Sequence, residues 1–263
     1  MDLGLKGRVA IVVAASKGLG RAAAEELAKE GCNVAISART LADLERTAAE
    51  IAKSTGKEVF FQAFDVKRED AIREFVSAVE KRFGRIDICV TNSGGPPSKK
   101  FAETTTGEWQ AAVDDMLLSA VTVAREVLPR MQKNRWGRFI TITSISVKQP
   151  IDGLILSNAV RAGVTGLAKT LAGEYGSSGI TVNNVCPGFT LTGRLEELAD
   201  KRAKDSGSTR EQVLAAMAAS MPLGRVVKTE EFAALVAFLA SERASAINGT
   251  TIAVDGGMVK SLL

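Results

Sequence analysis

A turn between an apolar run and a helical run near the N-terminus contains the residues best suited to binding a phosphate. The apolar run covers residues 9–13, the helical run covers 22–28, and the turn between them holds two glycines and a lysine. Backbone N–H groups and the positive end of a helix face into such a turn, which suits an anionic group such as a cofactor phosphate. Glycines also serve turn geometry alone, so a structural turn remains the alternative. The residues assigned to the ligand side are Ala14, Ser16, Lys17, Gly18, Leu19 and Gly20.

The rest of the chain alternates strand-like apolar runs with stretches of helical periodicity. Such alternation indicates a parallel sheet with helices on both faces, here a single doubly wound Rossmann-type α/β domain over residues 1–263. Residues 190–221 break the alternation with polar helical sequence, which favours a small lid over a linker. Seven strands are predicted at 9–13, 33–37, 59–64, 86–91, 138–143, 180–185 and 251–254, and further helices at 41–53, 71–82, 108–132, 158–175 and 230–240.

Local patterns inside these elements have structural explanations. A Ser or Thr with an acid three residues later resembles a helix capping box, and this spacing occurs at Thr40/Asp43, Thr105/Glu108 and Ser208/Glu211. Apolar residues in the lid either line a substrate pocket or pack as such helices usually do; they are Leu195, Leu198, Val213, Leu214 and Met217.

Composition excludes several classes of function. The net charge of +4 is dispersed along the chain, which indicates neither a nucleic-acid partner nor a membrane surface. The N-terminal residues lack a signal-peptide pattern and no apolar stretch reaches membrane-spanning length, so we expect a cytoplasmic protein. Cys32, Cys89 and Cys186 form no CxxC pair and are expected to be buried thiols. The chain has no histidine, the commonest general base, and its one tyrosine is Tyr175.

A series of short motifs, in order and correctly spaced, resembles the short-chain dehydrogenase/reductase family, closest to its 3-oxoacyl-acyl-carrier-protein reductase branch. The resemblance implies an oxidoreductase of small molecules that passes hydride between a nicotinamide and a carbonyl or alcohol carbon, assembled as a homo-oligomer (dimer or tetramer). The motifs are Gly18-Leu19-Gly20, Asp65-Val66, Thr91-Asn92-Ser93-Gly94, Gly137-Arg138-Phe139-Ile140 with Ser144, Asn184-Val185-Cys186-Pro187-Gly188 with Thr192, Pro222-Leu223-Gly224-Arg225, and Ile247-Asn248-Gly249 with Val254-Asp255-Gly256-Gly257.

The same resemblance implies where the cofactor binds. Asp65 would accept a hydrogen bond from the adenine amino group, although a turn residue capping the next helix is the alternative. Asn92 would approach the ribose, and the backbone after Pro187 and Gly188, with Thr192, would hold the carboxamide. The remaining residues assigned to the cofactor are Val66, Ser93, Gly94 and Arg161.

The residues after the second strand favour NADP(H) over NAD(H). A protein of this fold that selects NAD places a carboxylate there to accept the ribose hydroxyls. Here that strand ends Ser37-Ala38-Arg39, so Arg39 and Lys17 offer two cations to a 2′-phosphate. Ordinary solvated surface charges are the alternative for both residues.

The catalytic positions depart from the family pattern. Ser144 matches the family's serine, but the Tyr-x-x-x-Lys pair falls on Ser157 and Arg161, and the helix asparagine falls on Met116, which we interpret as a packed core residue. A serine hydroxyl is a weaker acid than a phenol and has less reach, and an arginine stays protonated, so it can polarise but cannot act as a base. Ala14 also replaces a family glycine.

Other proton donors are few. Tyr175 is 18 residues beyond Ser157 on one predicted helix, about 27 Å away at the rise of an α-helix. Lys148, on the loop after the fifth strand, is a candidate acid if desolvation beside Arg161 lowers its pKa; a solvated loop lysine is the alternative.

Two functions therefore remain open. The first is a divergent NADP(H)-dependent reductase of a carbonyl group, 3-oxoacyl-type or another ketone, in which Ser144, Ser157, Arg161 and Lys148 act on the substrate. Arg161 would supply charge to the carbonyl oxygen or to the ribose, or would instead bind a substrate carboxylate. The second is a catalytically inactive nucleotide-binding or scaffold protein that retains the fold.

Overall fold

The strands assemble into one seven-stranded parallel sheet, in the order β3-β2-β1-β4-β5-β6-β7, in the computed structural model, which describes residues 2–262. The order reverses between β1 and β4, so two helical crossovers leave in opposite directions and open a crevice at the carboxyl ends of these strands. The strands are β1 (Val9–Val13), β2 (Asn33–Ala38), β3 (Phe60–Ala63), β4 (Ile88–Thr91), β5 (Gly137–Ile142), β6 (Ile180–Pro187) and β7 (Thr251–Val254).

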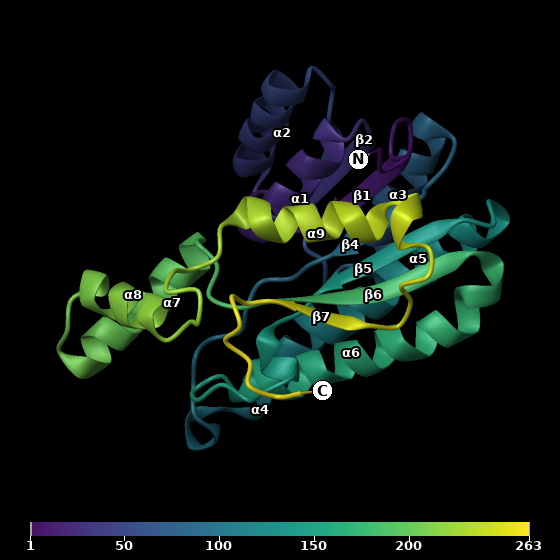
Figure 1. The fold of residues 1–263 in the computed structure, drawn as a ribbon. Helices are drawn as coiled ribbons and strands as arrows, with labels where there is room; N and C mark the ends of the chain where they lie inside the picture. The colour runs from purple at the N-terminus through teal and green to yellow at the C-terminus, as the bar shows by residue number, and fades with distance from the viewer. Residues whose placement is uncertain (1, 263) are drawn as a thin grey trace.

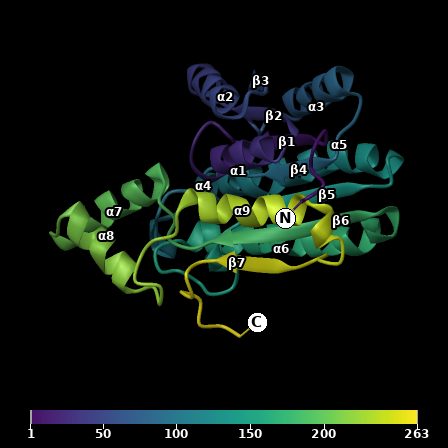
Figure 2. The same ribbon diagram turned by 45° about the horizontal axis from the view of Figure 1, so that its top comes forward.

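Helices cover both faces of the sheet (Figures 1 and 2). Alternating side chains of β1 supply the two cores: Ala10 and Val12 pack under α1, α2 and α9, whereas Val9, Ile11 and Val13 pack against α3, α5 and α6. The fold class predicted from the alternation is confirmed. The helices are α1 (Gly18–Lys29), α2 (Leu41–Thr55), α3 (Glu69–Phe83), α4 (Thr106–Ala112), α5 (Ser119–Lys133), α6 (Ile155–Tyr175), α7 (Gly193–Ser206), α8 (Arg210–Ala219) and α9 (Thr229–Ala240).

Differences from the predicted elements are local. The long helix predicted at 108–132 divides into α4 and α5, joined by the π-helical segment η2 (Val113–Leu118). The capping box at Thr105 is present, but Thr40 makes no side-chain cap, and the box predicted at Ser208 lies one residue later, on Thr209 and Gln212. Asp43 fails as a capping residue because its carboxylate binds two cations instead.

Residues 190–221 form α7 and α8, which pack mainly on each other and stand to one side of the sheet (Figure 1). A small apolar cluster joins them to the strand ends, and Leu198, Val213 and Leu214 pack against it, as the structural alternative for these residues predicted. The buried members of the cluster are Phe189, Leu195, Met217, Met221 and Val227.

The three cysteines are buried and free, as predicted, and burial raises the pKa of the Cys32 thiol to about 12. Within residues 2–262 we find no helix with the length and apolarity needed to cross a membrane.

Candidate active site

The carboxyl ends of β1, β4 and β6 bring distant segments of the chain together. The Asn92 side-chain amide donates to the Ala14 carbonyl at 3.3 Å, which fixes the end of β4 to the turn after β1. A Cβ placed on Gly18 would lie 3.5 Å from the Thr192 methyl group, so the segment after β6 faces the same turn. Three groups of residues assigned to the cofactor therefore line one crevice.

The turn after β1 has the backbone geometry of a phosphate cradle. Ala14 and Gly18 have φ angles of +52° and +57°, and a Cβ on Gly20 would lie 2.5 Å from the Ala14 carbonyl oxygen. No side chain caps the N-terminus of α1, and its first turn has no acid. Its first N–H groups therefore face the crevice with their donors available, and these residues fit a dinucleotide phosphate.

The positive φ of Ala14 stores strain in this turn. Glycine adopts that conformation without a Cβ penalty, so Ala14→Gly is expected to raise the free energy of unfolding by about 1 kcal/mol. Ala15→Gly is the matched control, because Ala15 is buried without a positive φ and the same change there should destabilise. Urea denaturation of both variants measures the difference, and a destabilised Ala14→Gly variant would contradict the strain assignment.

A carboxylate that the sequence interpretation treated as a cap lies beside the proposed 2′-phosphate site. Asp43 binds Lys17 at 2.8 Å and Arg46 at 2.5 Å, and these two cations, Lys17 first, hold the pKa of the Asp43 carboxyl below its usual range. Arg39 is exposed at the end of β2, and no described residue hydrogen-bonds or ion-pairs with its side chain. Of the two proposed phosphate ligands, Lys17 is thus paired with Asp43, whereas Arg39 has no partner among the described residues.

Removing the Asp43 charge tests this arrangement. Asp43→Asn is expected to tighten NADPH binding about two- to fivefold at low salt, the size of one exposed charge interaction, with the gain shrinking as salt rises. Asp70→Asn is the control, since Asp70 is also an exposed carboxylate paired with an arginine, Arg68, but lies on α3. Calorimetric titration gives both dissociation constants; weaker binding by Asp43→Asn would show that Asp43 organises the site instead.

Asp65 helps to form the turn after β3. One carboxylate oxygen accepts from the Lys67 N–H at 3.0 Å, and the other lies 3.8 Å from the Lys67 ammonium. Asp65 does not cap α3, whose N-cap is Arg68. The assignment of Asp65 to an adenine amino group stays a prediction, as do those of Val66, Ser93 and Gly94.

The three serines near the end of β5 form a chain of contacts that the sequence analysis did not foresee. The Ser144 hydroxyl accepts from the backbone N–H of Ser146 at 3.1 Å, and the Ser146 hydroxyl lies 3.4 Å from that of Ser157. Ser146 and Ser157 are buried, whereas Ser144 is partly exposed. Ser144 is therefore the hydroxyl of the three that is best placed to meet a substrate, with Ser146 linking it to α6.

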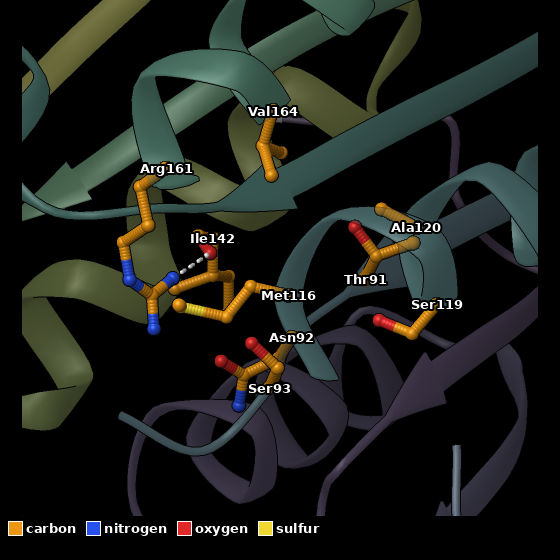
Figure 3. Close-up of a pocket in the computed structure, with 9 residues that line it drawn as sticks. All are labelled: Thr91, Asn92, Ser93, Met116, Ser119, Ala120, Ile142, Arg161 and Val164. Atoms are coloured by element: carbon orange, nitrogen blue, oxygen red, sulfur yellow. Dashed lines mark hydrogen bonds between the residues drawn. The ribbon is translucent and has the colours of Figure 1, made fainter. Parts of the chain in front are cut away.

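Arg161 lies one turn after Ser157 on α6 and is only 7% exposed. Its Nη1 donates to the Ile142 carbonyl at 3.1 Å, and burial lowers the pKa of the guanidinium to about 10, so it stays charged at neutral pH. Figure 3 shows the side chain projecting past Met116 into a pocket. That pocket is lined by Thr91, Asn92, Ser93, Met116, Ser119, Ala120, Ile142, Arg161 and Val164.

Other predicted residues occupy the same end of the sheet. Met116 is buried in an apolar cluster with Leu156 and Val160, which agrees with its interpretation as a packed residue. Lys148 is half-buried after the short helix η3 (Ile145–Val147). Burial raises the pKa of the Cys186 thiol, and the charge of Lys148 partly opposes that rise. Tyr175 ends the uninterrupted helix α6 at the far side from Ser157, as predicted.

The segment after β6 contacts the end of β7 and the loop after β4. Pro187 ends β6, and a Cβ on Gly188 would lie 2.7 Å from Asp255, so the two backbones are in direct contact there. The Thr192 hydroxyl caps α7 by accepting from the Leu195 N–H. From α7, Arg194 donates to the Pro96 carbonyl at 2.6 Å and Lys201 donates to that of Ser98, and no sequence pattern predicted these two contacts.

Comparison with known proteins finds relatives along nearly the whole chain. Residues 13–259 match the family model described as enoyl-(acyl carrier protein) reductase. The 3-oxoacyl-[acyl-carrier-protein] reductase of Staphylococcus epidermidis is 35% identical over 95% of this chain and 98% of its own, and the D-beta-hydroxybutyrate dehydrogenase of Rhizobium meliloti is 32% identical over the same shares. L-sorbose reductase from Gluconobacter frateurii, crystallised with NADPH and L-sorbose, superposes with a TM-score of 0.95 at 33% identity, covering all of both chains.

Proposed function

We propose a function from the premise that the chain belongs to the short-chain dehydrogenase/reductase family of oxidoreductases. It is an NADP(H)-dependent enzyme that reduces the carbonyl group of a small molecule, 3-oxoacyl-type or another ketone, or oxidises the corresponding alcohol. The observation that carries this proposal is the cradle at the N-terminus of α1 with the free Arg39 beside it. The NADPH bound to the sorbose reductase supports the same cofactor here.

The residues present fit that cofactor and divide its binding among them. The uncapped N–H groups of α1 would hold the pyrophosphate, and Arg39 with Lys17 would hold the 2′-phosphate. When bound, the cofactor supplies the hydride. Our assignment gives the chain three further tasks: Ser144 donates a hydrogen bond to the substrate carbonyl oxygen, Ser146 and Ser157 orient that hydroxyl, and Arg161 stabilises negative charge at the site.

The proton has to come from a group other than Arg161, whose pKa of about 10 keeps it charged throughout. Lys148 has an exchangeable proton, and its side chain has no hydrogen-bond or ion-pair partner among the described residues. Lys148 thus remains our candidate acid, with solvent as its competitor. Loss of a general acid typically costs about 10²–10⁴ in rate, so we expect turnover to be slow for this family.

Cofactor binding is the first test. Wild-type protein is expected to bind NADPH more tightly than NADH, and Arg39→Ala to weaken NADPH binding about tenfold or more while leaving NADH unchanged, because only NADPH carries the phosphate that Arg39 meets. Arg125→Ala, an exposed arginine on α5, is the control. Calorimetric titration with both nucleotides measures these affinities. Equal losses of affinity for NADPH and NADH in Arg39→Ala would show that Arg39 does not contact the 2′-phosphate.

The inactive alternative rests on the buried serine pair, because Ser157 is 6% exposed and its hydroxyl lies against Ser146 rather than in the crevice. NADPH binding without oxidation across a panel of ketones and oxo acids would favour that alternative. Assembly into a dimer or tetramer, in the cytoplasm, stays a prediction that size-exclusion chromatography with light scattering addresses in part.

A further inference from the structure

Arg194 joins two segments that come from opposite sides of the site. It is the second residue of α7, which follows β6, and its Nη2 donates to the carbonyl of Pro96, in the loop after β4, at 2.6 Å. The sheet order places β5 between β4 and β6, so the ends of those two strands are about 10 Å apart at the usual spacing of neighbouring strands. The side chain of Arg194 therefore spans the end of β5, the strand that leads to Ser144.

The residue before Pro96 gives the guanidinium a seat. A Cβ placed on Gly95 would lie 3.1 Å from Nε of Arg194 and 3.4 Å from both its Cζ and its Nη2, so the guanidinium rests close against the Gly95 backbone. A side chain larger than hydrogen at position 95 would push the guanidinium away. Arg194 thus makes two contacts with this loop, a hydrogen bond to one residue and a packing contact with the residue before it.

Both sides of this contact are anchored. The Ser98 hydroxyl donates to the Gly153 carbonyl at 3.0 Å, which fixes the loop after β4 to the loop after β5. On α7, Lys201 lies two turns beyond Arg194 on the same face and donates to the Ser98 carbonyl. These polar links add to the small apolar cluster that joins α7 to the strand ends.

The bridge lies on the path that a dinucleotide has to follow. The phosphate cradle is at the end of β1, and the sheet order continues from β1 through β4 to β5. A dinucleotide that rests on the cradle and reaches Ser144 therefore crosses these three strand ends in turn. Burial lowers the pKa of Arg161 to about 10, and repulsion from the charge of Arg194 adds to that effect, so Arg194 is within electrostatic range of the last part of this path.

We infer that Arg194 and Gly95 form a clasp across the cofactor crevice, which NADP(H) has to open when it enters and when it leaves. The inference rests on the proposed function, from which the cofactor is taken. A closed clasp reduces the fraction of molecules that can accept the nucleotide, and the same contact, formed again over the bound nucleotide, slows its release. An ordinary surface cation has the opposite effect on association, because it attracts an anion and its removal lowers the association rate constant.

Two variants open the clasp in different ways. Arg194→Ala removes the side chain, and we expect it to raise the association and dissociation rate constants of NADPH about five- to tenfold each, leaving the dissociation constant within about threefold. Gly95→Ala keeps the positive charge but displaces the guanidinium from its seat, so it should raise both rate constants as well. Stopped-flow fluorescence of NADPH measures association, and displacement of bound NADPH by excess NADP⁺ measures dissociation.

Each variant has a matched control. Arg210→Ala removes a cation whose side chain is 46% exposed, like that of Arg194, and which also pairs with an acid of the α7–α8 pair. Gly173→Ala adds a Cβ that meets nothing within 4 Å. Both controls should keep the wild-type rate constants. A lower association rate constant in Arg194→Ala, or unchanged rate constants in both clasp variants, would overturn the clasp and leave the proposed function intact.

Absence of NADPH binding would instead refute the proposed function, and proteolysis of the free protein then still tests the clasp. Thermolysin cuts beside apolar residues, which α7 and α8 expose when they detach from the strand ends, and cleavage tracks the population of that open form. Arg194→Ala and Gly95→Ala are expected to be cut within residues 193–219 about five- to tenfold faster than the wild type and Arg210→Ala. Equal cleavage rates would overturn the clasp.

Discussion

Arg161→Met is expected to produce a protein that is more stable and far less active. Methionine replaces an unpaired buried charge with an apolar chain of similar length beside Met116 and Val164, and such replacements of buried charges stabilise by about 1–3 kcal/mol. The lost hydrogen bond to the Ile142 carbonyl offsets about 1 kcal/mol of that gain. Guanidinium chloride denaturation measures the stability and NADPH oxidation the activity.

Arg138→Met provides a matched comparison, because the substitution is the same and the site is also buried. Arg138 donates to three carbonyls, which would lose this donor, and it also lies near Glu242 and over the face of Trp136, both of which Arg8 contacts as well. We expect this variant to be destabilised by about 3 kcal/mol or more. A gain in stability for Arg161→Met and a loss for Arg138→Met would identify Arg161 as a residue kept for binding at the expense of stability. A loss of stability in Arg161→Met would mean that the fold depends on Arg161.

Gly20→Ala is expected to damage both the fold and cofactor binding. The added Cβ would lie 2.5 Å from the Ala14 carbonyl oxygen and 3.1 Å from the Ala15 Cα, and neither backbone atom can rotate away. Forcing an extra carbon into a packed site costs about 1–3 kcal/mol. The displaced turn also misaligns the N–H groups of α1, so we expect NADPH affinity to fall at least about tenfold, equivalent to 1.4 kcal/mol.

Gly166→Ala on α6 is the control for that experiment. A Cβ there meets nothing within 4 Å, so alanine should stabilise the helix by about 0.5–1 kcal/mol through its higher helix propensity. Thermal denaturation and NADPH titration of the two variants measure both effects. An unchanged NADPH affinity in Gly20→Ala would show that the turn does not hold the nucleotide.

The sheet, its helices and the position of the crevice could be predicted because they depend on local patterns. The apolar runs at β1 and β7 give strand bounds that agree residue for residue. A polar residue precedes each run, Arg8 and Thr250, and Asp255 with two glycines follows the second. The π-helical segment η2 could not be predicted, because its residues keep helical periodicity and differ only in hydrogen-bond spacing.

The site was less accessible to sequence reasoning because its contacts join residues far apart in the chain. The family glycine that Ala14 replaces is consistent with the positive φ found at that position. The spacing of Thr40 and Asp43 resembles a capping box, so the sequence did not indicate that Asp43 pairs with Lys17. The link from Ser144 to Ser157 runs through Ser146, which belongs to no recognised motif. The isolation of Arg161 from any acid is visible only once burial and neighbours are known.

The way in which α7 and α8 are attached to the sheet predicts how fast their backbone amides exchange with solvent. These helices are tied to the rest through one small apolar cluster and through hydrogen bonds from Arg194 and Lys201 to loop carbonyls, while the sheet is locked by continuous ladders. Segments with few buried contacts open at a fraction of the global unfolding free energy. The backbone amides of α7 and α8 are therefore expected to exchange with deuterium as a separate cooperative unit while those of β1, β4 and β5 stay protected.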